Sequence, residues 1–208
     1  MPPRRRKVQD RWKIKDWYAI SSPPYFGGKY IGSTPSNDSE KVIGRVIEPT
    51  LYDLTGDHTQ QHLKLFFQIV DVKNHEAETI FKGHEYSQDF LKSLVRRRST
   101  RIDSRAKVTT KDGYTLRVSA VVFSVMRVRN SQKIAIRKII DETVEDKAKN
   151  LNFDQFVQEA VLGKIASDIY NQATKLFPIR HIGIRKSKLI AYPSEDPNKR
   201  TPEIELEA

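Results

Sequence analysis

The tripeptide Lys111-Asp112-Gly113 separates two stretches of alternating apolar and polar residues, and its geometry decides how the two stretches can pair. A two-residue Asp-Gly turn would set cations opposite apolar residues and mix the two faces of the sheet. A three-residue loop with Gly113 in the left-handed region instead aligns the apolar residues of both stretches. The sequence therefore predicts a β-hairpin of residues 101–109 and 115–129 with one apolar face.

The same loop length also fixes which charges face each other across the hairpin. The predicted pairs are Val108 with Leu116, Ala106 with Val118, and Lys107 with Arg117. Like charges directly opposite each other destabilise a sheet, so the Lys107–Arg117 pair should weaken the isolated chain. A polyanion lying across the hairpin would remove this repulsion, which favours a phosphate-rich partner.

Basic residues outnumber acidic ones, 37 to 26, and give the 208-residue chain a formal net charge of +11. Such a charge favours nucleic acid as the partner first and an anionic membrane second. No run approaches the roughly 20 apolar residues of a spanning helix, and no apolar segment follows the basic start as a signal peptide requires. We therefore expect no membrane partner. The absence of cysteine excludes disulfides and thiolate metal sites and fits a reducing cytosol.

Composition divides the chain into three predicted parts. Residues 1–40 should form an extended basic arm rich in aromatic residues, 41–192 a single globular α+β domain, and 193–208 a disordered acidic tail. Free linkers rarely carry as many aromatic residues as this arm, so we expect it to order on a surface. A hydrophobic content of 38% allows one core, with much of the chain solvated or covered by a partner.

Periodicity supports the α+β assignment, because strand patterns come first along the chain and helical patterns later. Besides the hairpin, strands are predicted at about residues 42–48, 62–72, 78–86 and 179–191. Helices are predicted over residues 87–97, 131–149 and 152–176. Asn152 is the candidate N-cap of the last helix, and Pro178 follows its end.

Five groups of cations are predicted to bind RNA, and acidic residues are almost absent from them. The groups are Arg4, Arg5, Arg6, Lys7, Arg11 and Lys13, with Trp12 among them; Arg96, Arg97, Arg98 and Arg101; Arg105, Lys107, Lys111 and Arg117; Arg127, Arg129, Lys133, Arg137 and Lys138; and Arg180, Arg185, Lys186 and Lys188. Lysine and arginine neutralise phosphates, and a tryptophan between them can stack on a base. The last group alternates partly with Ile182 and Ile184, which predicts cations along one side of the final strand.

Most of these groups also have an explanation that needs no RNA. The first could be a solvated tail, the second could complement the dipole at a helix C-terminus, and the last could protect an exposed edge strand. The group within residues 127–138 lacks such an explanation, because its last three cations fall in the first turns of a predicted helix. Cations there oppose the helix dipole, and a pair such as Lys138–Glu142 offsets this only in part.

Signals for catalysis or metal binding are poor. His58 and His62 have the spacing of half a metal site, but no glutamate completes the H-E-x-x-H signature. Gly27-Gly28 lacks the pattern of a P-loop, and no serine lies in a G-x-S-x-G motif. We therefore expect no metal, no cofactor and no enzymatic activity.

Several segments, taken in order, are similar to one protein family. They are Lys15-Asp16-Trp17-Tyr18, Pro24-Tyr25-Phe26, Gly44-Arg45-Val46-Ile47-Glu48, Leu51-Tyr52-Asp53-Leu54, Thr109-Thr110-Lys111-Asp112-Gly113-Tyr114-Thr115-Leu116-Arg117, Phe177-Pro178 and Ile184-Arg185-Lys186-Ser187-Lys188. Together they resemble the S3Ae family, also called eS1, of small-ribosomal-subunit proteins of archaea and eukaryotes. The resemblance covers about residues 12–190, and the short carboxy end resembles the archaeal members.

This resemblance implies a fold, a location and partners. The implied fold is an antiparallel β-barrel-like core flanked by helices, which the basic arm precedes. The implied location is the cytoplasmic ribosome, on the platform of the small subunit near the 3′ end of its RNA and the messenger exit. The implied partners are small-subunit ribosomal RNA, neighbouring ribosomal proteins of the platform, and messenger RNA at the exit. The family is not one of enzymes.

Two other hypotheses remain open from the sequence. The first is a free single-stranded RNA-binding or translation-initiation module on a similar barrel, which needs exposed aromatic side chains on its strands. The candidates for that role are Phe66, Phe81 and Phe123. The second is an RNA-processing enzyme, whose candidate residues are His58, His62 and His181.

Overall fold

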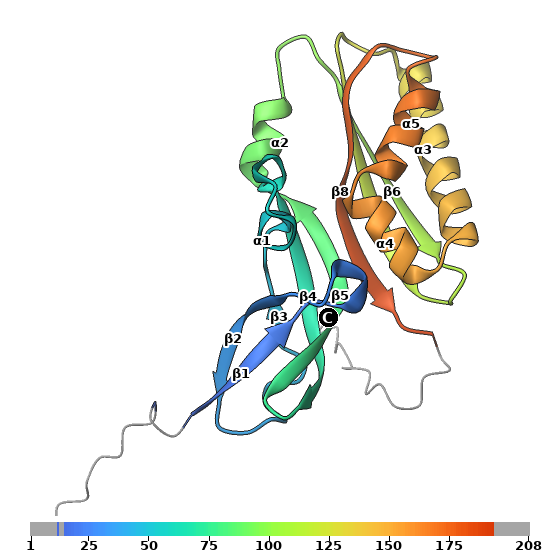
Figure 1. The fold of residues 1–208 in the computed structure, drawn as a ribbon. Helices are drawn as coiled ribbons and strands as arrows, with labels where there is room; N and C mark the ends of the chain where they lie inside the picture. The colour runs from blue at the N-terminus through green and yellow to red at the C-terminus, as the bar shows by residue number, and fades with distance from the viewer. Residues whose placement is uncertain (1–11, 13–14, 194–208) are drawn as a thin grey trace, which may run out of the picture.

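The computed structural model describes residue 12 and residues 15–193, whose arrangement Figure 1 shows. The strands in this part of the chain are β1 Asp16–Ser21, β2 Tyr30–Ser36, β3 Val46–Ile47, β4 Leu63–Lys73, β5 Glu76–Tyr86, β6 Arg101–Thr109, β7 Thr115–Ser124 and β8 Ile179–Ala191. The α-helices are α1 Leu51–Thr55, α2 Gln88–Leu94, α3 Asn130–Asn150, α4 Phe153–Val161 and α5 Lys164–Ala173. Short 3-10 turns are formed by Pro24–Phe26 and His58–Gln60. Strands and helices are therefore combined in one fold, as predicted.

The eight strands form one sheet that stays open and does not close into a barrel. The strand order is β2-β1-β5-β8-β7-β6, with β4 paired to β5 and β3 paired to β4. The end strands β2 and β6 do not pair with each other. The predicted barrel-like core is therefore wrong in one respect, because the sheet does not close into a barrel. Helix α3 lies along β6 instead: Arg137 Nε donates to the main-chain oxygen of Asp103 at 3.2 Å, and Ser104 Oγ donates to a carboxylate oxygen of Asp141.

The predicted hairpin and its register are confirmed. Strands β6 and β7 pair antiparallel, with Val108 opposite Leu116, Ala106 opposite Val118, and Lys107 opposite Arg117. Gly113 has a φ of +84°, so it occupies the left-handed region that the three-residue loop requires. The second strand ends at Ser124 and not at residue 129, because the Ser124 hydroxyl bonds to the main chain of Thr100 and Met126 and turns the chain there.

The main core lies between this sheet and the three helices α3, α4 and α5, which cover one face of β6, β7 and β8 (Figure 1). Ile136, Ile140 and Phe156 come from the apolar stripes of these helices and are buried with Val118 and Val122 of β7. The alternation of β7 and the helical spacing therefore identified the two sides of this core correctly.

The opposite face of β7 is also covered near its end. Val121 and Phe123 are fully buried there, because Leu91 of the short helix α2 packs against them. Phe81 and Phe123 are less than 2% exposed, so neither offers the exposed ring that a single-strand binding module needs. The outer face of the sheet thus changes from apolar under α2 to cationic toward the hairpin loop.

The helix predicted over residues 152–176 is in fact two helices, α4 and α5. Gly163 lies between them with a φ of +84°, and a left-handed residue ends a helix. The side chain of Asn152 does not cap α4, which corrects that prediction. Asp112 of the hairpin loop caps it instead, since its Oδ2 accepts a hydrogen bond from the Phe153 N–H at 2.8 Å.

Residues 16–21 and 30–36 form β1 and β2 of the sheet and not an extended arm, so the predicted arm is wrong for these residues. Strand β1 pairs antiparallel with β2 and parallel with β5. Tyr18 and Ile20 are buried in a second, smaller core with Ile69. The Tyr25 hydroxyl oxygen accepts a hydrogen bond from the Phe81 N–H at 3.1 Å, which ties the turn after β1 to β5. The division of the chain into domains otherwise remains a prediction.

Strand β8 is interrupted by three register shifts against β7. Each shift leaves one extra residue in β8: Arg180, Arg185 and Ile190. These bulges break the predicted alternation of the last strand, because Ile182 and Ile184 face the core whereas Lys186 and Lys188 face outward. The strand also lies between β5 and β7, so the explanation as a charge-protected edge strand does not apply.

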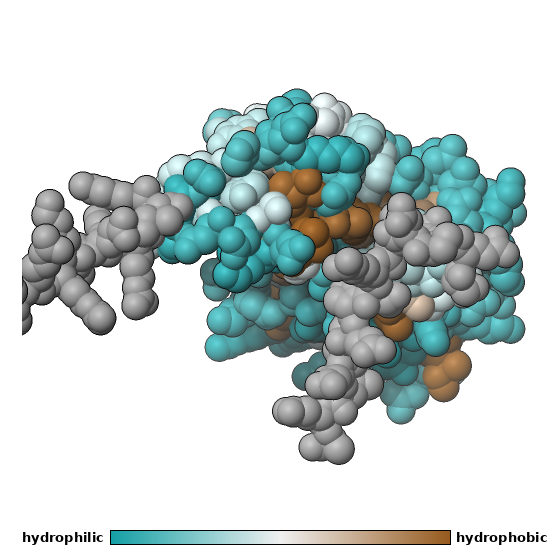
Figure 2. Space-filling model, turned by 90° about the horizontal axis from the view of Figure 1, so that it is seen from below, coloured by the Kyte–Doolittle hydropathy of each residue, from teal (hydrophilic) through white to brown (hydrophobic). Residues whose placement is uncertain are grey.

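The surface agrees with the low hydrophobic content. Seen from below, most of this face is hydrophilic, and hydrophobic residues gather near its middle (Figure 2). No helix in residues 15–193 is long and apolar enough to cross a bilayer.

Candidate RNA-binding surface

Two loops that are distant in sequence meet at one end of the molecule and form a basic tip, defined here as Arg96, Arg97, Arg98, Arg127 and Arg129. Thr100 holds the loops together. Its N–H donates to Ser124 Oγ at 2.9 Å, its main-chain oxygen accepts from the Ser124 N–H at 3.0 Å, and its Oγ1 accepts from the Val128 N–H at 3.1 Å. The structure therefore unites parts of two groups that the sequence predicted separately.

The arginines of the basic tip are exposed and electrostatically uncompensated. Within residues 15–193 none of the five has an acidic partner at ion-pair distance, although that stretch holds nine such pairs. Arg98 and Arg127 line an open cleft of about 530 Å³ together with the exposed side chain of Met126. Arg98 also has a φ of +62°, an unusual conformation for a side-chain-bearing residue. The tip thus presents several guanidinium groups to a ligand.

The start of helix α3 continues the positive surface from the tip. Arg129 and Lys133 lie at the N-terminus of the helix, which is the positive end of its dipole. No acidic residue in the first turn offsets their charge. Lys138 forms the predicted pair with Glu142 at 3.7 Å, but both side chains are exposed and such pairs contribute little. The stability of the helix alone therefore does not explain why these cations lie at its start.

A second positive feature, the cationic row, crosses the outer face of the sheet. It consists of Lys107 on β6, Arg117 on β7, Lys188 on β8 and Lys82 on β5. Arg117 is the register partner of both Lys107 and Lys188, and Lys188 is the partner of Gly83, next to Lys82. Burial lowers the pKa of Lys82, and the charge of Lys188 lowers it further. The row therefore continues over four strands.

Sequence reasoning missed Lys82, because its position depends on a bulge. The register of β4 and β5 shifts between Phe66 and Phe67, which leaves Lys82 as the extra residue between Phe81 and Gly83. Gly83 allows the close approach of β8 at this point: a Cβ there would lie 2.3 Å from the main-chain oxygen of Ser187. Neither feature has a signal in the local sequence.

The remaining predicted residues are distributed over several places. Arg105 is exposed on the outer face of β6, and Lys111 is exposed in the hairpin loop at the far end of the sheet from the tip. Arg101 forms an ion pair with Asp103 at 2.9 Å, and Lys186 forms one with Glu85 at 2.8 Å. Trp12 is 63% exposed, with Lys15 Nζ 4.0 Å from its ring centroid. The other predicted residues of the first group, Arg4 to Lys7, Arg11 and Lys13, lie outside the described residues.

The three histidines of the enzyme hypothesis do not form one cluster. His58 stacks on Tyr52 with ring centroids 4.6 Å apart, whereas His62 and His181 lie in an aromatic cluster with Tyr86 and Phe90. Among the described residues, no group of three His, Cys, Asp or Glu side chains is placed to hold a metal ion. The structure thus offers no arrangement that favours the enzyme hypothesis.

The buried histidine His84 was not singled out from the sequence. Burial lowers its pKa to about 4. Its Nε2 lies 3.0 Å from the main-chain oxygen of Ile184 and must donate, so Nδ1 accepts from the Ser187 hydroxyl at 2.7 Å. This neutral imidazole joins β5 to β8 beneath the cationic row and is part of the scaffold that positions it.

The fold and its exposed cations define a basic α+β protein whose charges suit an anionic polymer, as in ribosomal proteins. Comparison with known proteins gives the particular family. The profile of the Ribosomal S3Ae family matches residues 3–193, and the chain belongs to this family.

Curated relatives of archaeal origin agree with this assignment. The "Small ribosomal subunit protein eS1" of Staphylothermus marinus is 48% identical over 197 residues, which is 94% of this chain and 93% of the relative. The proteins of the same name from Desulfurococcus amylolyticus and Sulfolobus acidocaldarius are 48% and 46% identical, over 92% and 89% of this chain and 90% and 95% of each relative. The family resemblance is confirmed, and with it a structural, non-enzymatic role in the small subunit of the cytoplasmic ribosome.

Proposed function

We propose that the chain binds small-subunit ribosomal RNA through the basic tip, the start of α3 and the cationic row. The observation that carries the proposal is the tip itself. Five exposed arginines from two segments about 30 residues apart converge there, and within residues 15–193 no acidic side chain pairs with them. Arginine forks match phosphate geometry, so this surface suits an RNA backbone.

The family resemblance also supports a finer placement, which is part of this proposal. We place the protein on the platform of the small subunit, near the 3′ end of the subunit RNA and the messenger exit. Its partners there are the ribosomal RNA, neighbouring ribosomal proteins and messenger RNA at the exit. The exposed apolar side chains Val95, Val125 and Met126 lie among the arginines of the tip, and they are available to pack against RNA sugars or a neighbouring protein.

Most contacts should be made to phosphates and sugars, which position the protein without reading sequence. The cationic row supports this view, because its like charges are unfavourable in the free chain and become favourable when phosphates lie between them. Of the three rings that a free single-strand binding module would use, Phe81 and Phe123 are buried and only Phe66 is partly exposed, so this alternative has less support.

The proposal is tested by measuring the affinity of the full chain for a platform fragment of the small-subunit RNA at several salt concentrations. Replacing Arg98 and Arg127 with glutamine should reduce the slope of log affinity against log salt by roughly 1.4–1.8, which corresponds to two lost phosphate contacts. The matched control replaces Lys64 and Lys149, two exposed lysines away from the tip, and should leave the slope unchanged. Equal slopes for the two double variants would refute the role of the tip.

A further inference from the structure

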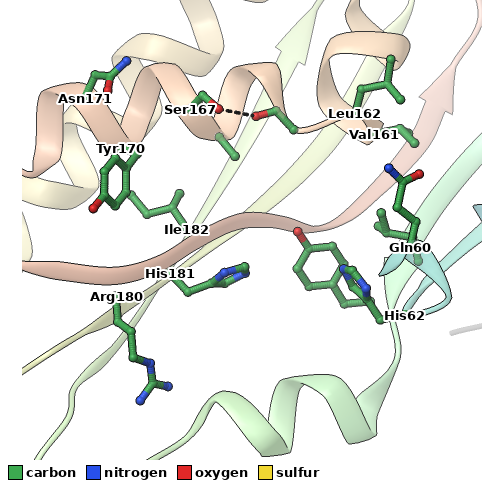
Figure 3. A pocket seen from close by; sticks show the side chains of 14 residues that line it. Gln60, His62, Val161, Leu162, Ser167, Tyr170, Asn171, Arg180, His181 and Ile182 are labelled. Carbon is green, nitrogen blue, oxygen red and sulfur yellow. Dashed lines mark hydrogen bonds between the residues drawn. The ribbon is translucent and has the colours of Figure 1, made fainter. Parts of the chain in front are cut away.

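A cleft of about 460 Å³ lies between the two halves of the fold, apart from the basic tip and the cationic row (Figure 3). The turn before β4 and the end of β5 form one wall, and the α4–α5 junction with α5 forms the other. The start of β8, residues 180–182, runs along its base. Sites for small molecules are clefts of roughly 300–1,000 Å³, so this volume suits a ligand of nucleotide size.

A β-bulge brings two consecutive residues of β8 into the lining of this cleft. Successive residues of a regular strand point to opposite faces. Here the register against β7 shifts between Phe123, paired with His181, and Ser124, paired with Ile179, so Arg180 is the extra residue. As a result both Arg180 and His181 belong to the lining; in Figure 3 His181 points toward His62, whereas Arg180 extends along the edge of the cleft, away from α5. Bulges commonly re-aim side chains next to functional sites.

Both of these side chains hold a buried polar atom without a partner in the described part of the chain. The atoms are Nη2 of Arg180 and Nε2 of His181. Buried polar groups are nearly always satisfied, because leaving one unpaired is unfavourable. The guanidinium can only donate, so its missing partner must be an acceptor. No acidic residue lines the cleft, so no carboxylate of the lining competes with the acceptor of a ligand for this guanidinium.

Flat ring surfaces border the same space. His62 and Tyr86 lie 5.2 Å apart between ring centroids, and Tyr86 and His181 lie 6.5 Å apart. Burial lowers the pKa of His181, and the neighbouring His62 and Arg180 lower it further, so the imidazole is neutral at pH 7. A neutral imidazole offers one donor and one acceptor. The side-chain amides of Gln60 and Asn171 on opposite walls add further donors and acceptors.

We propose that this cleft binds one unpaired nucleotide of RNA, with its phosphate at Arg180 and its base against the rings of Tyr86 and His181. The inference rests on the proposed function and adds a specific pocket to it. Base–aromatic stacking and edge hydrogen bonds are the means by which proteins recognise unpaired RNA bases. The cleft supplies both, together with a cation for the phosphate.

The test uses the full chain, labelled with ¹⁵N, and adenosine 5′-monophosphate as the probe. The nucleotide should shift the amide signals of residues 180–182 and of α5, whereas adenosine and ribose 5-phosphate should each bind more weakly. Arg180→Gln should weaken nucleotide binding by about tenfold or more, because a charged hydrogen bond is lost. Lys149→Gln, a distant exposed cation, is the matched control and should bind like the parent chain.

A second variant guards against a folding defect in the first. Ser167 is exposed on α5 and lines the cleft, so Ser167→Trp should fill the cleft without disturbing the core and should abolish the shifts. The proposal would be overturned if the nucleotide caused no shifts in the parent chain, or if Arg180→Gln bound the nucleotide as tightly as the parent chain does. It would also be overturned if a glutamate-rich peptide, and not the nucleotide, shifted these signals.

The same samples separate this proposal from the broader one. If the platform RNA fragment binds with its full salt dependence but the nucleotide does not bind, the cleft proposal fails and the proposed function stands. If the nucleotide binds but the RNA fragment does not, the cleft is supported and the role of the basic tip fails.

Discussion

Replacing Lys107 and Arg117 together with glutamine should stabilise the free protein and weaken its binding to RNA. Both side chains are exposed on the outer face of the sheet, so glutamine fits there without a change in packing. The expected gain comes from like charges alone. The gain therefore tests whether the cationic row lowers the stability of the protein in the absence of RNA.

The size of the gain follows from the strand register. Lys107 faces Arg117, and Arg117 also faces Lys188, so the double variant removes two like-charge contacts. Such contacts destabilise a sheet by roughly 0.2–1 kcal/mol each, which gives an expected gain of about 1 kcal/mol. For a chain of this size the melting temperature should rise by about 3 °C. Arg117→Gln alone should gain about twice as much as Lys107→Gln, because it removes both contacts.

The assay is thermal unfolding of the free chain at low salt and at 1 M salt, with Lys64→Gln as the control. At 1 M salt the screening length falls to about 3 Å, so the gain should largely disappear. A lower melting temperature of the double variant, or a gain that salt does not change, would refute the repulsion argument. In RNA binding, the salt slope should fall by roughly 1.4–1.8 if each cation neutralises one phosphate.

Further predictions concern the scaffold beneath this surface. Because burial lowers the pKa of His84 to about 4, the unfolded chain takes up a proton near pH 6.5 while the folded chain does not. His84 alone should therefore lower the free energy of unfolding by about 3 kcal/mol as the pH is lowered from 6.5 to 4, and NMR titration should show His84 still neutral at pH 5.5. Asp112→Ala should cost about 1 kcal/mol in chemical denaturation by removing the cap of α4, whereas Asn152→Ala should cost clearly less. Gly83→Ala should destabilise by roughly 1–3 kcal/mol, since its Cβ would collide with the main chain of Ser187, and an unchanged denaturation midpoint would show that β5 and β8 can separate freely.

The features that the sequence predicts correctly are those with local causes. The hairpin register follows from alternation on both sides of a three-residue loop, and Gly113 provides the one conformation that this loop needs. The pattern of residues 179–191 predicts the last strand correctly, but it does not predict the bulges at Arg180 and Arg185. Bulges depend on how neighbouring strands twist and pair, and the order of apolar and polar residues within one strand does not indicate this.

The candidate sites show the same division. The arginine runs of the tip were visible as runs, but their convergence depends on Thr100, which bonds to residues more than 20 positions away. Lys82 and the cleft around His181 were missed because they depend on strands and helices meeting from distant parts of the chain. The arm was predicted as extended because prolines and glycines suggested it, whereas Tyr18 and Ile20 supply enough apolar surface to join the sheet.

The contact between helix α3 and strand β6 has a consequence for the time before assembly. A newly synthesised ribosomal protein exists briefly without RNA, and an open strand edge invites pairing with another copy and aggregation. In this chain Arg137 donates a hydrogen bond to a main-chain oxygen of the edge strand β6, and the outward cations Arg105 and Lys107 repel the edge strand of a second copy. The charges that suit the finished particle thus also keep unassembled copies apart.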